Sequence, residues 1–205
     1  SDINIGGWPR SGGGVNADGA RDQTGYTITL TAATGALRID GGTITGGTIV
    51  ENGAALELSG SNNNVLDGVT VQGSGDFTEG SARVRLRNGA GFTGDVTLAT
   101  TNAALAYEHT GSLASGRSVI FDSSTIGTKF LTVEGNNTLT IENGATVRGR
   151  NGQIRGSIFV GGSQHVVNDG LISADFDGSS ITIASSLSTF TNNGVAEAIG
   201  GGRLL

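Results

Sequence analysis

The sequence predicts an all-β fold, a single-stranded parallel β-solenoid of about nine coils. Three observations lead to this prediction. The apolar residues are mostly Val, Ile and Leu, and they alternate with polar residues in short runs. Glycine is frequent at 37 residues, while proline occurs once. Turn signals separate the runs at intervals that cluster around 20 to 25 residues, the length of a repeat unit.

Strand-length alternations begin at Tyr26 and continue to the end of the chain. In each run the side chains two positions apart point the same way, so Ile, Leu and Val face inward while Thr, Arg and Glu face outward. Coils of about 22 residues stacked about 4.8 Å apart give a rod of roughly 45 Å. The runs are 27–31, 36–39, 55–58, 69–71, 84–86, 96–98, 119–121, 139–141, 158–160 and 181–183.

Asn-Gly and Asp-Gly pairs mark the corners between the runs. Both residues of such a pair tolerate positive φ, which a tight corner requires. Asn-Gly also closes two-residue hairpins, so an antiparallel sandwich or barrel is the main rival fold. The very short runs favour the solenoid, and so do recurring corner asparagines, which can stack into hydrogen-bonded ladders. The pairs lie at 52–53, 67–68, 88–89, 143–144, 151–152, 169–170 and 193–194.

We expect two parts, a Gly-rich lead-in or cap at 1–25 and parallel β-helix repeats at 26–205. Trp8 is the one large apolar group of the lead-in. The segment 102–109 has a helix-like composition but spans barely two turns, so we interpret it as an irregular corner or insertion. The chain has no methionine, even at position 1, and no polar capping segment at 199–205. It is therefore interpreted as a fragment of a longer chain.

Composition narrows the functional classes. The net charge is −6 and Lys129 is the one lysine, so nucleic acid is not an expected partner. Cysteine is absent, which excludes disulfides and thiol chemistry. No run approaches the roughly 18 apolar residues of a membrane span. Thr, Ser and Asn supply most of the polar surface, which is typical of secreted or cell-surface β-proteins. No cofactor is expected.

Four segments resemble known repeats. The segments 37–49 (LRIDGGTITGGTI) and 64–73 (NVLDGVTVQG) resemble right-handed parallel β-helix coils of the pectate-lyase-like superfamily. The segments 167–174 (VNDGLISA) and 191–198 (TNNGVAEA) resemble the repeats of filamentous-haemagglutinin-type exoproteins and autotransporter passengers. The resemblance implies a right-handed β-helix from an extracellular bacterial protein. It does not select an activity, because this fold carries lyases, hydrolases, tailspikes and adhesins.

The strongest charge feature is an arginine run. Arg83, Arg85 and Arg87 alternate with apolar residues on one strand face, and Arg148 and Arg150 repeat the arrangement about three coils later. If the coil length holds, all five share one side of the rod and can bind an anionic glycan. The alternative is an ordinary solvated strand face whose arginines form salt bridges to neighbouring coils.

Catalytic groups are less evident. Glycosidases place two carboxylates across a cleft, and Asp175 and Asp177 lie on one face, but we favour an ordinary exposed strand face for them. Asp122, Glu134 and Glu142 fall near strand ends without the signatures of the polygalacturonase-like hydrolases. The two histidines, His109 and His165, have no companion at metal-ligand spacing, so no metal site is expected.

The sequence therefore predicts a structural or adhesive stalk segment of a secreted or surface-exposed bacterial protein. An anionic polysaccharide or a host or cell surface is the expected partner, with end-to-end or lateral self-association as a further option. The alternative function is a polysaccharide lyase or hydrolase, or a tailspike-like glycan-binding β-helix. Aromatic residues make up only 5% of the chain, which counts against that alternative because such sites use aromatic platforms.

Overall fold

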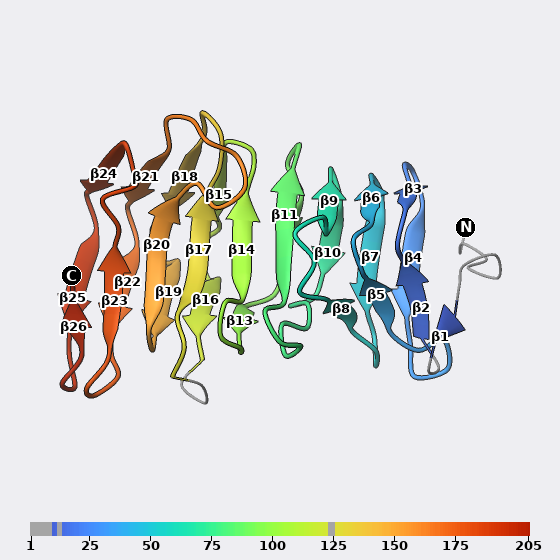
Figure 1. Cartoon of the computed structure of the whole chain (residues 1–205), viewed down its shortest axis with the longest axis horizontal. Helices are drawn as coiled ribbons and strands as arrows, with labels where there is room; N and C mark the ends of the chain where they lie inside the picture. Colours follow the sequence, from blue (N-terminus) through green and yellow to red (C-terminus); the bar gives the residue numbers. More distant parts are fainter. Residues whose placement is uncertain (1–9, 12–13, 123–125) are drawn as a thin grey trace.

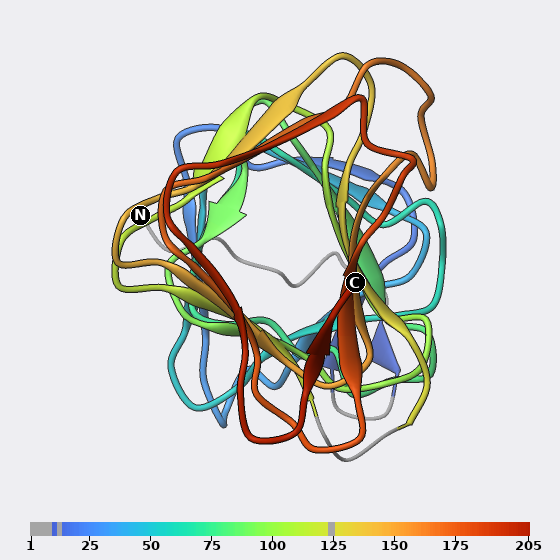
Figure 2. The same cartoon turned by 90° about the vertical axis from the view of Figure 1, so that its left-hand side faces the viewer.

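A computed structural model describes residues 10–11, 14–122 and 126–205. The described chain is a parallel β-solenoid of about eight turns, close to the predicted nine. Successive coils lie side by side along the long axis, from the N-terminal coil to the C-terminal one (Figure 1). Viewed along that axis, the coils superpose around a common centre (Figure 2).

One sheet runs the whole length of the solenoid, and we call it the spine. Each of its strands pairs in parallel with the strand of the next coil. The spine strands are β3 (Ala20–Asp22), β6 (Thr43–Thr45), β9 (Val65–Asp67), β11 (Arg83–Arg87), β14 (Ala104–Tyr107), β17 (Lys129–Val133), β20 (Gly152–Gly156), β23 (Ser180–Ile183) and β26 (Arg203–Leu204).

The other two faces are each built from two shorter sheets. Strands that precede the spine strand of their coil form one sheet in the first coils and another in the later coils. These strands are β2 (Gly14–Ala17), β5 (Leu37–Ile39) and β8 (Leu56–Leu58), then β13 (Val96–Leu98), β16 (Ser118–Phe121), β19 (Thr146–Gly149), β22 (Leu171–Ala174) and β25 (Val195–Ala198).

Strands that follow the spine strand are divided in the same way. They are β4 (Thr27–Leu30), β7 (Thr48–Glu51), β10 (Thr70–Gln72) and β12 (Gly91–Phe92), then β15 (Gly111–Leu113), β18 (Thr138–Ile141), β21 (His165–Asn168) and β24 (Thr189–Asn192). Among the described strands, only the short β1 (Arg10–Ser11) pairs antiparallel, with β2. The antiparallel sandwich is therefore excluded for the described residues.

Inward side chains stack into columns along the axis. In the spine, Ile44, Leu66, Leu86, Tyr107 and Val133 occupy successive rungs, and all are buried. They belong to one apolar cluster that extends through the interior. Full burial of each aliphatic side chain is worth about 1.5–3 kcal/mol. A coil cannot bury this face alone, so the stacking of neighbours supplies the stability.

Several corners have the backbone conformation that the turn pairs of the sequence predict. Asn88, Gly89 and Asn151 adopt positive φ at predicted turn pairs. The expected asparagine ladder forms where Asn168 Nδ2 donates to Asn192 Oδ1 at 2.6 Å. Glycine is also required inside the solenoid, because a Cβ on Gly152 would lie 2.1 Å from the ring of Phe121.

Three expectations differ from the structure. The run 158–160 is not a strand but a bend. Its backbone amides donate to the carboxylate of Glu134 instead of to the backbone of a neighbouring strand. The segment 102–109 contains β14 rather than a corner, because its small alanines fit a strand that is buried on both faces. The first rung already starts at Gly14, within the predicted lead-in, and Val15 and Ala17 are buried there.

Every other predicted run contains part of a strand. Trp8 lies outside the described residues. Among the described residues, no helix is long and apolar enough to cross a membrane.

Candidate functional site

The arginine run forms the strand β11 of the spine. Val84 and Leu86 are fully buried, whereas Arg83, Arg85 and Arg87 point away from the core. This alternation is the one that the sequence predicts for a half-buried strand. The three guanidinium groups are not free, however, because each bonds to a neighbouring coil.

Arg83 connects three coils. Its Nη1 donates to Asn62 Oδ1 of the preceding coil at 2.7 Å, and its Nη2 donates to the carbonyl oxygen of Asn102 in the following coil at 3.2 Å. Its Nε donates to the carbonyl oxygen of Ser81 at 2.9 Å. Partial burial lowers the pKa of Arg83 below the usual arginine value, yet a guanidinium group stays charged in proteins. Arg83 thus links three successive coils through hydrogen bonds.

Arg85 and Arg87 converge on one carboxylate. The Nε of Arg85 donates to Glu108 Oε1, and the Nε of Arg87 donates to Glu108 Oε2 at 2.6 Å. Only 8% of the Glu108 side chain is exposed, against 15% for Arg85 and 37% for Arg87. The Arg85 guanidinium also lies over the ring of Phe159, 5.2 Å from its centroid. Charge-assisted bonds at low exposure are stronger than surface ion pairs.

Arg148 and Arg150 lie on a different face. Arg148 belongs to β19, where its Nη1 is 3.4 Å from Asp175 Oδ2, and Arg150 follows that strand and stacks on Phe176 at 4.8 Å. The register of the spine instead brings Arg155 into the column of Arg85, three rungs later. The coils differ in length, so a fixed spacing does not identify residues that share a face.

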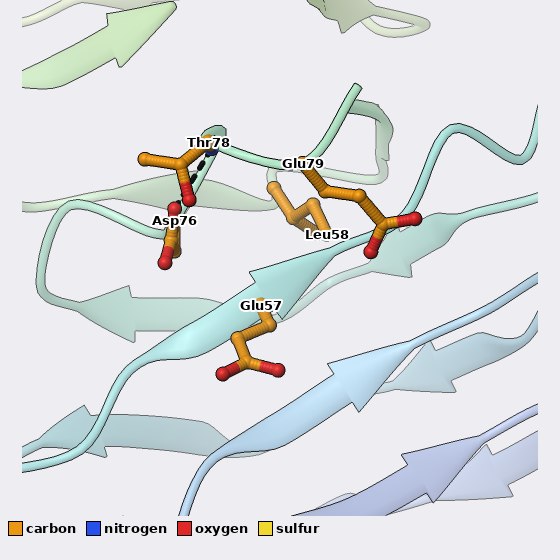
Figure 3. A pocket seen from close by; sticks show the side chains of 5 residues that line it. All are labelled: Glu57, Leu58, Asp76, Thr78 and Glu79. Atoms are coloured by element: carbon orange, nitrogen blue, oxygen red, sulfur yellow. Dashed lines mark hydrogen bonds between the residues drawn. The ribbon is translucent and has the colours of Figure 1, made fainter. Parts of the chain in front are cut away.

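A second charged feature is an acidic hollow of about 170 Å³ (Figure 3). Glu57 and Asp76 form a parallel bridge on neighbouring coils, and Glu79 also lines the hollow. Arg38 holds the Glu79 carboxylate with bonds of 2.8 to 3.1 Å. Asp76 accepts from the Thr78 amide, as the dashed line in Figure 3 shows.

This acidic group is not predicted from the sequence. Glu57 and Asp76 are separated by about one coil length, which is the signal that could have paired them. The predicted carboxylates lie elsewhere, because Asp175 faces Arg148 and Glu134 is fully buried. Within the described ranges, no three His, Cys, Asp or Glu side chains are placed to hold a metal ion.

Buried charges also bond to the coils. Glu134, with no exposed surface, accepts bonds from Thr132 Oγ1 and from three backbone amides at 158–160. Lys129 is equally buried, and its Nζ donates to the carbonyl oxygen of Asp122 at 2.8 Å. Burial lowers the pKa of Lys129, and the charge of Asp122 opposes that shift. Both ionic groups therefore hold backbone segments in place.

Comparison with protein-family models, with curated proteins and with solved structures gives no match for this chain.

Proposed function

We propose that this chain is a structural and adhesive stalk segment of a secreted or surface-exposed bacterial protein. The observation that carries the proposal is the use of the charged side chains. Arg83, Arg85, Glu108 and Glu134 each bond to a neighbouring coil. Together with the unbroken spine, these bonds favour a rod whose stacking resists unravelling.

The adhesive part of the proposal concerns an anionic polysaccharide or a cell surface that carries one. Among the described arginines that form ion pairs, Arg148 and Arg87 have the most exposed side chains. The exposed fractions are 47% for Arg148 and 37% for Arg87. Each has one carboxylate partner, so guanidinium N–H groups remain for an added anion. Because the two lie on different faces, they would contact a polymer independently.

Mechanical unfolding tests the stalk. Pulled from its ends, the chain is expected to lose coils in discrete steps, and each coil of about 23 residues releases roughly 80 Å. Limited proteolysis provides a second readout, with cuts confined to exposed loops while the strands stay intact. Featureless extension at low force, together with rapid digestion throughout the chain, would show that the stacked coils do not resist load.

Polymer binding is tested separately with single substitutions. Arg87→Ser and Arg148→Ser are expected to weaken binding to a polyuronate and to lower its dependence on salt. Arg117→Ser is the matched control, since it removes one exposed positive charge from outside both ion pairs. Equal binding by all three variants would refute the adhesive role of these arginines without affecting the stalk.

A further inference from the structure

The parallel ladder is interrupted between β12 and β15. On this face, one sheet ends at β12 and the next begins at β15, although both strands directly follow neighbouring spine strands. The spine stays paired at the same level through β11 and β14. The two coils are therefore hydrogen-bonded on the spine side but not between β12 and β15.

A hollow of about 300 Å³ lies at this interruption. Its size is at the lower end of the range for small-molecule pockets. Apolar and polar groups line it together, and no carboxylate, lysine or arginine does. The main lining residues are Ala90, Phe92, Tyr107, His109, Ser112 and Leu113.

Tyr107 is the unexplained polar group of the hollow. It occupies an inward column of the spine between Leu86 and Val133, and only 6% of its surface is exposed. Its phenol oxygen makes no hydrogen bond within the described residues, and it is not among the fully enclosed unpaired atoms, so it can be reached from the hollow that the side chain lines. The hydroxyl of a largely buried tyrosine usually has a partner. The hollow is the space in which that partner can lie.

His109 adds an acceptor beside this phenol. Its Nδ1 is 3.1 Å from the carbonyl oxygen of Leu86, and a carbonyl can only accept, so this contact selects the tautomer with the proton on Nδ1. Nε2 is then an open acceptor. Gly111 leaves room for it, because a Cβ there would lie 2.6 Å from Nε2. The imidazole and phenol rings are in contact at 5.8 Å between centroids.

Backbone groups face the gap as well. Gly91 and Thr93 donate their amides to β10, so the alternate amide and carbonyl of Phe92 face away from that strand. Leu113 accepts from Glu142 on the β18 side, so the alternate backbone groups of Ser112 face the interruption. The hollow thus combines donors and acceptors with the ring of Phe92.

We propose that this hollow binds one neutral sugar ring, such as the end or a side branch of a glycan. A pyranose has hydroxyl groups for the phenol, the imidazole Nε2 and the free backbone groups. Its C–H face can pack against Phe92 and Leu113. The uncharged lining favours a neutral sugar over a uronate, because a buried carboxylate without a cationic partner is costly. The site does not depend on the stalk function.

Calorimetric titration with methyl glycosides of neutral hexoses and N-acetylhexosamines tests the proposal on the whole chain. At least one glycoside is expected to bind with a Kd below about 10 mM. Tyr107→Phe removes only the hydroxyl and is expected to weaken that binding at least about fivefold. Tyr26→Phe is the control, because that side chain is half exposed and lies outside the hollow.

A second pair of variants tests the location. A Cβ on Gly91 or on Gly80 meets no atom within 4 Å, but only Gly91 lines the hollow. Gly91→Val is expected to reduce sugar binding, and Gly80→Val to leave it unchanged. The site is refuted if no neutral glycoside binds, if Tyr107→Phe binds as well as the original chain, or if triglycine binds and sugars do not.

Discussion

Replacing Glu134 with glutamine is expected to release the loop 157–164, which joins β20 to β21. This loop projects beyond the outline of the other coils (Figure 2, orange, upper right). Glu134 Oε1 accepts from Thr132 Oγ1 at 2.6 Å and from the Ile158 amide at 2.8 Å. Oε2 accepts from the amides of Phe159 and Val160 at 2.8 and 2.7 Å.

The expected loss of stability follows from the NH2 group of glutamine, which cannot accept a hydrogen bond. If the glutamine NH2 replaces Oε2, it faces two amide donors and both bonds are lost. If it replaces Oε1, the Thr132 hydroxyl can turn to accept, and only the bond from Ile158 is lost. One unsatisfied amide costs about 1–3 kcal/mol. Glu134→Ala removes all three amide bonds, but the loop is partly exposed, so water limits the loss to about 3–5 kcal/mol.

Amide hydrogen exchange measures this effect directly. Protection of at least one amide within 158–160 is expected to fall between about fivefold and a hundredfold in Glu134→Gln. Glu142→Gln is the control, because that carboxylate is bonded by Ser112 and the Ser115 amide on another coil. Protection at 158–160 that stays within twofold of the original chain in Glu134→Gln would refute the reasoning.

Two further predictions concern the interior. Gly152→Ala should destabilise the solenoid by about 1–3 kcal/mol, since its Cβ meets the buried Phe121 ring, whereas Gly80→Ala should change little; equal urea midpoints would contradict this. Burial raises the pKa of Tyr107 to about 12. The stabilisation from its neutral form is complete below pH 10 and is lost as the pH rises from 10 to 12, by ~1.4 kcal/mol per pH unit. Absorbance titration of a Tyr26→Phe variant, which leaves Tyr107 as the one tyrosine, should show ionisation near pH 12, and ionisation near pH 10 would contradict the prediction.

Local sequence patterns were sufficient to predict the solenoid. Alternation places Val84 and Leu86 inward, and the turn pairs mark corners such as Asn88 and Gly89. Alternation predicts a strand wrongly where a side chain, rather than a neighbouring strand, bonds the backbone amides. The bend at 158–160 has the composition of a strand, but Glu134 from the preceding coil bonds its amides. A carboxylate about one coil away gives no local signal.

The candidate sites were harder to predict for a related reason. Lateral neighbours depend on the sum of all intervening coil lengths, and these vary, so Arg155 rather than Arg148 reaches the column of Arg85. The hollow at Tyr107 depends on a ladder interruption that neither β12 nor β15 reveals by its own sequence. Tyr107 looks like one residue of an alanine-rich segment until the register places it in the core.

The arginine cluster and the hollow occur at the same level of the solenoid, and one physical cause connects them. Between β11 and β14 the coils have a spine rung, but the ladder on the face of β12 and β15 is missing there. That junction has fewer backbone bonds than a complete coil interface. Arg85 and Arg87 bond across it to the nearly buried Glu108, which compensates in part for the missing ladder. The charges that hold the junction together thus lie on the spine, and the opening on another face remains available to a ligand.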